Sequence, residues 1–158
     1  MQLPTAITAL LLFLLLAGCS SQPAAPPDAT QANNVAFTAM NQVGKPYRYG
    51  GNTPNAGFDC SGLIGYVYRD SEGIALPRTV AAISDDASPD VTDPADLFTG
   101  DIVIFGHSVF ATPDHAGIYV GKGRFVHAPS RGGKVRLDSL NSRYWQPRFI
   151  KAKRPLSR

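Results

Sequence analysis

Cys60 and two histidines are the residues of this sequence best suited to covalent chemistry. Cys60 lies in the segment FDCSG, and its thiolate would be a nucleophile toward a carbonyl carbon. His115 opens the segment HAGIYVG, and an imidazole within reach of a thiol can accept its proton. His127 ends the segment RFVH, where a third polar group would fix the orientation and tautomer of His115. The three side chains together predict acyl transfer through a thioester.

The chain's other cysteine has a different expected fate. Residues 6–17 form an uncharged apolar run that is short for a bilayer span, and it ends in the sequence LAGC at Cys19. An apolar run with small residues before a cleavage point is typical of a secretory signal. The sequence LAGC resembles the lipobox of bacterial lipoproteins, which implies that residues 1–18 are removed and Cys19 is lipidated. Ser20 then implies sorting to the outer membrane of a Gram-negative cell, with the protein facing the periplasm.

Lipidation of Cys19 would leave Cys60 as the only free thiol in an oxidising compartment. A lone secreted thiol has three explanations, which are catalysis, an intermolecular disulfide and burial. The two histidines favour catalysis.

Asp59 and Ser61 flank the nucleophile at a predicted helix start. A helix N-terminus lowers the pKa of a thiol, whereas the charge of Asp59 raises it. We therefore expect Asp59 to cap the helix and orient it, and His115 to complete the activation. The backbone N–H of Cys60 or Ser61 is the expected oxyanion donor.

The elements that must position these residues follow from the hydrophobic pattern. Residues 19–34 are rich in Pro, Ala and Ser and predict a disordered tether, which makes 35–158 the folded domain. Helices are expected over residues 35–43, 60–70 and 79–86. From Gly100 onward, short β-branched and aromatic runs alternate with turns. Helices followed by a meander of strands predict an α+β fold, with helices packed on an antiparallel sheet of five or six strands.

One strand gives a more specific expectation. Alternation places His115, Gly117 and Tyr119 on one face of the strand that begins at residue 115. We expect Gly117 to leave room for the Cys60 helix next to the imidazole.

Charge narrows the choice of partner. The formal net charge is +3 and the pI is near 9.0, which suits a protein that stays near a polyanion. No run of Lys and Arg with interleaved aromatic residues occurs, so we expect no nucleic-acid partner. We expect a monomer that needs no cofactor and no metal.

Six segments in a fixed order resemble the NlpC/P60 family of cell-wall peptidases and cover nearly all of residues 40–130. They are GKPYRYGG, FDCSGL, LPRT, GDIVIF, HAGIYVG and FVHA. The resemblance implies a papain-like fold and peptidoglycan stem peptides or cross-links as the substrate. It implies that Cys60 is the nucleophile, His115 the base and His127 the third polar residue, with the hydroxyl of Tyr47 beside the nucleophile. The nearest likeness is to single-domain lipoprotein murein endopeptidases of Gram-negative bacteria.

Arg78, in LPRT, would meet either a substrate carboxylate or a structural one. Residues 106–114 look longer and more apolar than is usual in the family, and His107 in this loop has no assigned role. Three alternatives stay open. One is a zinc site of Cys60, His107, His115 and His127. The others are a non-catalytic murein-binding lipoprotein and an acyltransferase or amidase of the same fold.

Overall fold

A computed structural model describes residues 24–131 and 133–157. The expected signal peptide and the lipidation site Cys19 lie outside these residues. Within the described ranges, none of the helices has the length and apolar character needed to span a bilayer.

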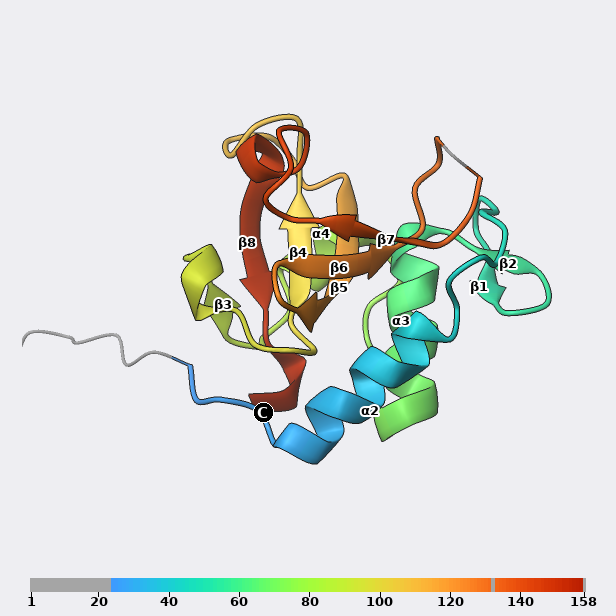
Figure 1. Cartoon of the computed structure of the whole chain (residues 1–158), viewed down its shortest axis with the longest axis horizontal. Coiled ribbons are helices and arrows are strands. Elements are labelled where there is room, and N and C mark those ends of the chain that lie inside the picture. Colours follow the sequence, from blue (N-terminus) through green and yellow to red (C-terminus); the bar gives the residue numbers. More distant parts are fainter. Residues whose placement is uncertain (1–23, 132, 158) are drawn as a thin grey trace, which may run out of the picture.

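A six-stranded antiparallel sheet forms the centre of the fold (Figure 1). Its strand order is β3-β8-β4-β5-β6-β7. In that order the strands are β3 (Asp90–Val91), β8 (Phe149–Lys153), β4 (Ile102–Phe105), β5 (His115–Gly121), β6 (Arg124–His127) and β7 (Arg136–Ser139). A small hairpin pairs β1 (Asn52–Thr53) with β2 (Gly57–Phe58). The predicted α+β class with about six strands is confirmed, whereas the two-residue strands β1, β2 and β3 are too short to show a period in sequence.

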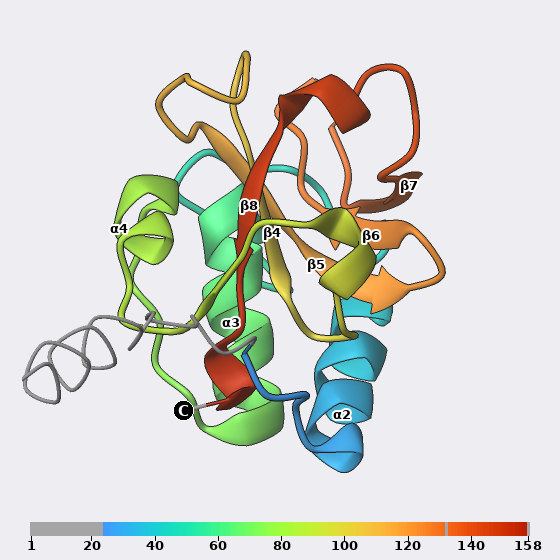
Figure 2. The same ribbon diagram turned by 90° about the vertical axis from the view of Figure 1, so that its left-hand side faces the viewer.

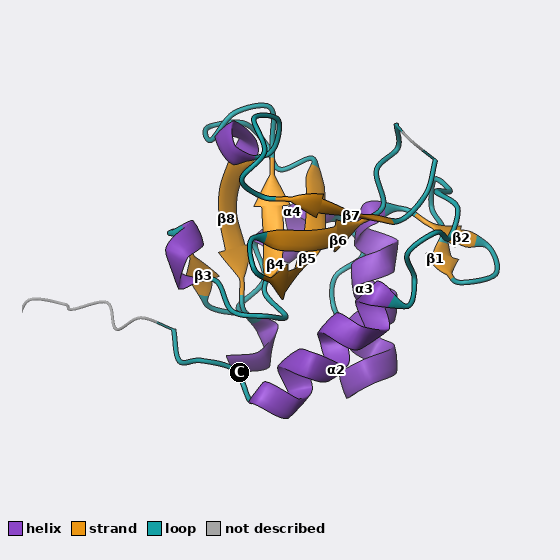
Figure 3. Cartoon of the chain, in the orientation of Figure 1, coloured by secondary structure: helices purple, strands orange, loops and turns teal. Residues whose placement is uncertain are grey.

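The helices lie mainly on one side of the sheet (Figure 3). They are α2 (Ala29–Met40), α3 (Cys60–Glu72) and α4 (Val80–Ser84), with short 3₁₀ helices η1 (Pro94–Asp96), η2 (Gln146–Arg148) and η3 (Pro155–Ser157). Helix α3 packs against α2 and against β5, and in the turned view of Figure 2 it lies behind β8 and β4. The helix that carries Cys60 is therefore in contact with the strand that carries His115.

Helix α3 begins and ends where local chemistry requires. Asp59 caps it by accepting a hydrogen bond from the N–H of Gly62 at 2.7 Å. Gly73 ends it in the left-handed region, at φ 66°. Gly62 has a second role, because a Cβ there would lie 2.0 Å from the carbonyl oxygen of Gly51. The loop before the nucleophile therefore packs directly on the first turn of the helix.

The two faces of the sheet contribute to separate cores. The face toward the helices contributes Ile102, Ile104, Ala116, Ile118 and Val126. The opposite face contributes Val103, Phe105, Phe125, Phe149 and Ala152, and Trp145 covers them.

The expectation for Gly117 was wrong. A Cβ at Gly117 would lie 2.7 Å from the ring of Phe125 and 2.8 Å from the carbonyl oxygen of Val126, on the face away from α3. Its neighbour Ala116 is the small residue that packs in the core shared with α3. Gly117 thus makes room for the next strand's side chains and not for the helix.

Residues 29–34 of the expected tether belong instead to helix α2. Helix α2 begins at Ala29, because Asp28 caps it through the N–H groups of Thr30 (2.9 Å) and Gln31 (3.1 Å). The face that α2 buries contains the small side chains of Ala32 and Ala39, so its periodicity is weak in sequence.

The segment before α2 is docked on the domain through Arg154. This buried arginine forms a two-pronged ion pair with Asp101, at 2.9 and 2.8 Å, and donates to the backbone carbonyls of Ala24 (2.9 Å) and Asp96 (2.7 Å). Both members are almost fully buried, at 2% and 1% exposure. Figures 1 and 2 accordingly show the start of the described chain beside its C-terminus.

We predict that Arg154→Met destabilises the fold by about 3–5 kcal/mol, because it leaves the Asp101 carboxylate buried without its cation. Urea unfolding measures the change. The matched control is Lys151→Met, which removes a partly exposed contact with Asp90 at 3.1 Å and should cost under about 1 kcal/mol. Equal losses in the two variants would contradict this assignment.

Candidate active site

Cys60 occupies the first position of α3, where the helix meets the start of β5. The backbone N–H groups of Cys60, Ser61 and Ala116 are directed at its sulfur. Because Ala116 directly follows His115, this contact brings the first residue of β5 to the nucleophile's side of the site. The helix start and the strand start that the sequence singled out therefore meet.

His115 and His127 form a direct pair. Nε2 of His115 lies 2.8 Å from Nδ1 of His127, and their rings are nearly perpendicular. Because Nε2 of His115 faces His127, Nδ1 is the ring nitrogen of His115 that this contact does not use. Trp145 stacks on the His115 ring, with centroids 5.3 Å apart and planes at 22°.

Asp138 is a further member of the site that sequence reasoning missed. Its Oδ2 lies 3.0 Å from Nε2 of His127 and accepts hydrogen bonds from Nε1 of Trp145 (2.9 Å) and from the guanidinium of Arg136 (2.9 and 3.2 Å). The register of β6 and β7 places it there, because Phe125 pairs with Asp138 and His127 pairs with Arg136. The usable signal was the alternation after residue 135, in which Leu137 joins the helix-side core while its neighbours face the other side.

Burial sets the charge state of both histidines. It lowers the pKa of His115 to about 3, and His127 and Arg136 act in the same direction while Asp138 opposes them. It also lowers the pKa of His127 to about 4, against the opposing effect of Asp138. Both imidazoles are therefore neutral near pH 7, and His115 is available to accept a proton.

The thiol is neutral at rest as well. Burial raises the pKa of Cys60, and the charge of Asp59 raises it further. The N–H groups of Ser61, Ala116 and Cys60 lower it, as expected for a helix start, but they do not outweigh burial. Such a pair fits a thiol that gives up its proton to His115 as it attacks, and not a preformed thiolate–imidazolium ion pair.

Asp59, which precedes Cys60, forms an ion pair with Arg78. The guanidinium binds both carboxylate oxygens of Asp59, at 2.9 and 2.8 Å, and the hydroxyl of Ser61 at 2.8 Å. Burial raises the pKa of Asp59, but Arg78 and the N–H groups of Gly62 and Gly50 hold it below its ordinary value. Arg78 thus meets a structural carboxylate, one of the two options that the sequence left open.

Tyr47 is near enough to Cys60 for the two side chains to affect each other electrostatically. Its N–H donates to the carbonyl of Gly133 at 2.7 Å, and its side chain packs against the helix-side core. Burial raises the pKa of its phenol, and Cys60 and Asp59 raise it further. The hydroxyl is therefore electrostatically coupled to the nucleophile.

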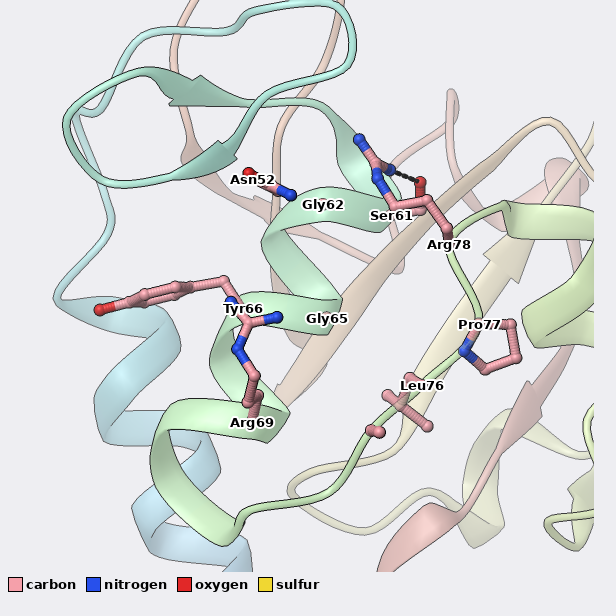
Figure 4. A pocket seen from close by; sticks show the side chains of 10 residues that line it. Asn52, Ser61, Gly62, Gly65, Tyr66, Arg69, Leu76, Pro77 and Arg78 are labelled. Atoms are coloured by element: carbon pink, nitrogen blue, oxygen red, sulfur yellow. Dashed lines mark hydrogen bonds between the residues drawn. The ribbon is translucent and has the colours of Figure 1, made fainter.

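A shallow pocket of about 100 Å³ extends along α3 from Ser61 and Arg78 (Figure 4). Arg78 and Ser61 lie at the end near the first turn, and Arg69 lies at the far end. Leu76 and Pro77 line it from the segment that runs alongside the helix.

His107 is not part of this arrangement. Its side chain is 92% exposed, and its Nδ1 lies 2.8 Å from Oδ2 of Asp114. Over the described ranges no cluster of three or more His, Cys, Asp or Glu residues is placed to hold a metal, so the zinc alternative has no ligand set there.

Comparison with known proteins agrees with this geometry. Residues 44–154 match the NlpC/P60 family. The murein DD-endopeptidase MepH of Escherichia coli is 42% identical over 130 residues, which are 80% of this chain and 47% of MepH. The probable endopeptidase NlpC of Escherichia coli is 36% identical over 147 residues, or 89% of this chain and 93% of that protein. The chain therefore spans less than half of one relative and nearly all of the other.

Among solved structures, an NlpC/P60 family protein from Bacillus cereus is similar at a TM-score of 0.73 and 30% identity. The match covers 83% of this chain and 41% of that one.

The two buried histidines predict a loss of stability in acid. Their folded pKa values, about 3 and about 4, lie below the unfolded value of 6.5, so the unfolded chain binds more protons as pH falls. The stability is fully present above pH 6.5 and is lost as pH falls from there toward 4. We expect a loss on the order of 2–4 kcal/mol between about pH 7.5 and 5.

Urea unfolding followed by the fluorescence of Trp145, the chain's one tryptophan, measures this loss. His127→Gln should show a smaller loss, because the glutamine does not titrate. The control His107→Gln, at an exposed histidine, should lose as much as the wild type. An identical pH dependence in His127→Gln would refute the assignment.

Proposed function

The chain belongs to the NlpC/P60 family, and from that premise we propose that it is a peptidoglycan endopeptidase. Its substrates would be peptide bonds in murein stem peptides or cross-links, hydrolysed by a cysteine-peptidase mechanism. The proposal rests on the packing of α3 against β5, two elements that begin at Cys60 and His115, and on the 2.8 Å contact between His115 and His127. The names of the relatives MepH and NlpC support the same class of reaction.

In the proposed acylation, Nδ1 of His115 accepts the thiol proton as the sulfur of Cys60 attacks the scissile carbonyl carbon. The carbonyl oxygen becomes an oxyanion, which the backbone N–H groups of Cys60 or Ser61 stabilise at the helix start. The C–N bond then breaks, and His115 gives its proton to the leaving amine. This leaves a thioester between the substrate's acyl group and Cys60.

In deacylation, His115 accepts a proton from water while the water oxygen attacks the thioester carbon. The C–S bond breaks, the thiol regains its proton and the peptide leaves as a carboxylic acid. Hydrolysis, as opposed to acyl transfer to another amine, requires that water reaches the thioester.

We further propose that residues 1–18 are a signal peptide and that Cys19 carries the lipid that anchors a monomer to the outer membrane, facing the periplasm. The docking of Ala24 on Arg154 would shorten the free tether to a few residues. At about 3.3–3.6 Å per residue, residues 19–23 would reach at most about 18 Å. The domain would then work close to the membrane surface and not at the end of a long tether.

Zymography of the full-length protein against purified peptidoglycan tests the proposed function. We expect clearing by the wild type and loss of clearing in Cys60→Ala, because the thioester cannot form. His107→Ala, outside the site, should clear as the wild type does. Equal clearing by wild type and Cys60→Ala would rule out a cysteine peptidase.

Digestion of defined muropeptides, followed by mass spectrometry, identifies the bond. Products with a new carboxyl group would indicate hydrolysis. Products joined to a second amine would identify an acyltransferase instead.

A further inference from the structure

We propose that Asp138 is a positioning residue that sets the tautomers of His127 and His115, so that His115 presents an unprotonated Nδ1 to Cys60. This inference rests on the proposed function and adds a fourth residue to the site formed by Cys60, His115 and His127.

The need for such a residue arises because the third member of the site is itself a histidine. A neutral imidazole donates from one nitrogen and accepts at the other, and either nitrogen can carry the proton. The 2.8 Å contact between His115 and His127 is therefore compatible with two proton arrangements. In one, His127 donates and Nδ1 of His115 carries a proton, so His115 cannot act as a base. In the other, His115 donates from Nε2 and Nδ1 is free.

Asp138 selects the second arrangement. An ionised carboxylate only accepts hydrogen bonds, so the 3.0 Å contact requires that His127 carries its proton on Nε2. Nδ1 of His127 is then an acceptor, and Nε2 of His115 must be the donor to it. The lone pair of His115 therefore lies on Nδ1, the nitrogen left for the thiol.

The surroundings of Asp138 keep it an acceptor. Arg136 and Trp145 can only donate, and both donate to the same oxygen that faces His127. Burial raises the pKa of Asp138, but the hydrogen bonds from Trp145 and Arg136 and the contact with His127 hold it below its ordinary value. The charged and titratable groups that face the carboxylate are thus Arg136 and His127.

The carboxylate also opposes the effect of burial on the two imidazoles. It raises the pKa of both, whereas Arg136 lowers them. When His115 takes the thiol proton, the positive charge that develops on the pair is stabilised by Asp138 through His127. Asp138 therefore acts on the proton acceptor and does not need to touch the substrate.

A double-mutant cycle with His127 tests the proposal in the full-length protein. In the wild-type background we expect Asp138→Ala to lower kcat by about 10²-fold with KM nearly unchanged, because an orienting residue contributes at the proton transfer. In the His127→Gln background the same substitution, Asp138→Ala, should lower kcat by less than about 3-fold. An amide at position 127 can turn its oxygen toward Nε2 of His115 without help from Asp138.

Asp138→Asn is the conservative variant. Its amide oxygen can still accept from Arg136, Trp145 and His127, so it should keep the tautomers, lose the charge, and fall in kcat by only about 10-fold. The matched control is Asp90→Ala. Asp90 lies on β3, at the edge of the sheet opposite to β7, and forms ion pairs with Lys151 and Lys153 of β8. This substitution should leave kcat unchanged.

Nitrogen-15 NMR of the histidine side chains gives a readout that needs no substrate. The wild type and Asp138→Asn should show His115 protonated on Nε2 alone, and Asp138→Ala should show a mixture of tautomers. A single unchanged tautomer in Asp138→Ala, or an equal loss of kcat in both backgrounds of the cycle, would overturn the proposal. Failure of the wild type to cleave murein would instead count against the proposed function and leave the tautomer result standing.

Discussion

The contact between the first turn of α3 and the start of β5 is the constraint on which the site depends. Helix α3 packs against β5, and the backbone N–H groups of Cys60, Ser61 and Ala116 at these two starts lower the pKa of the Cys60 thiol. Gly62 lets the loop at Gly51 pack on the same turn, and Ala116 lets the strand pack against the helix. A side chain at position 62 would displace the loop at Gly51, which packs on the turn that carries Cys60.

The burial that this packing produces explains the electrostatics of the site. Burial moves the pKa of Cys60 up and the pKa of His115 down, so both members of the pair are uncharged at rest. The ionised side chains of the site form two ion pairs, one near Cys60 and one near His127. Asp59 is neutralised by Arg78, and Asp138 is neutralised by Arg136. Charge develops between these two ion pairs only when the proton moves.

Sequence predicted the parts of this site that are locally encoded. The cap at Asp59 and the apolar stripe that follows fix the start of α3, and the strands were visible from their β-branched runs. Three features depend on pairing across the chain and were missed or misplaced. Asp138 reaches His127 only through the register of β6 and β7. Gly117 faces Phe125 of the neighbouring strand β6, and local alternation does not show which face of β5 the helix covers. The face that α2 buries contains alanines, so it differs little in hydrophobicity from the exposed face. The direction of the thiol's pKa was open for the same reason, since burial is a property of the whole fold.

A neutral thiol and a neutral imidazole form the resting pair of this site. The ultraviolet absorbance of the Cys60 thiolate, titrated against pH with the Cys60→Ala signal subtracted, tests it most directly. If the resting pair is neutral, thiolate appears only at a pH above 9.0, the ordinary pKa of a thiol. A thiolate signal already present at about pH 5, as in a thiolate–imidazolium ion pair, would contradict it.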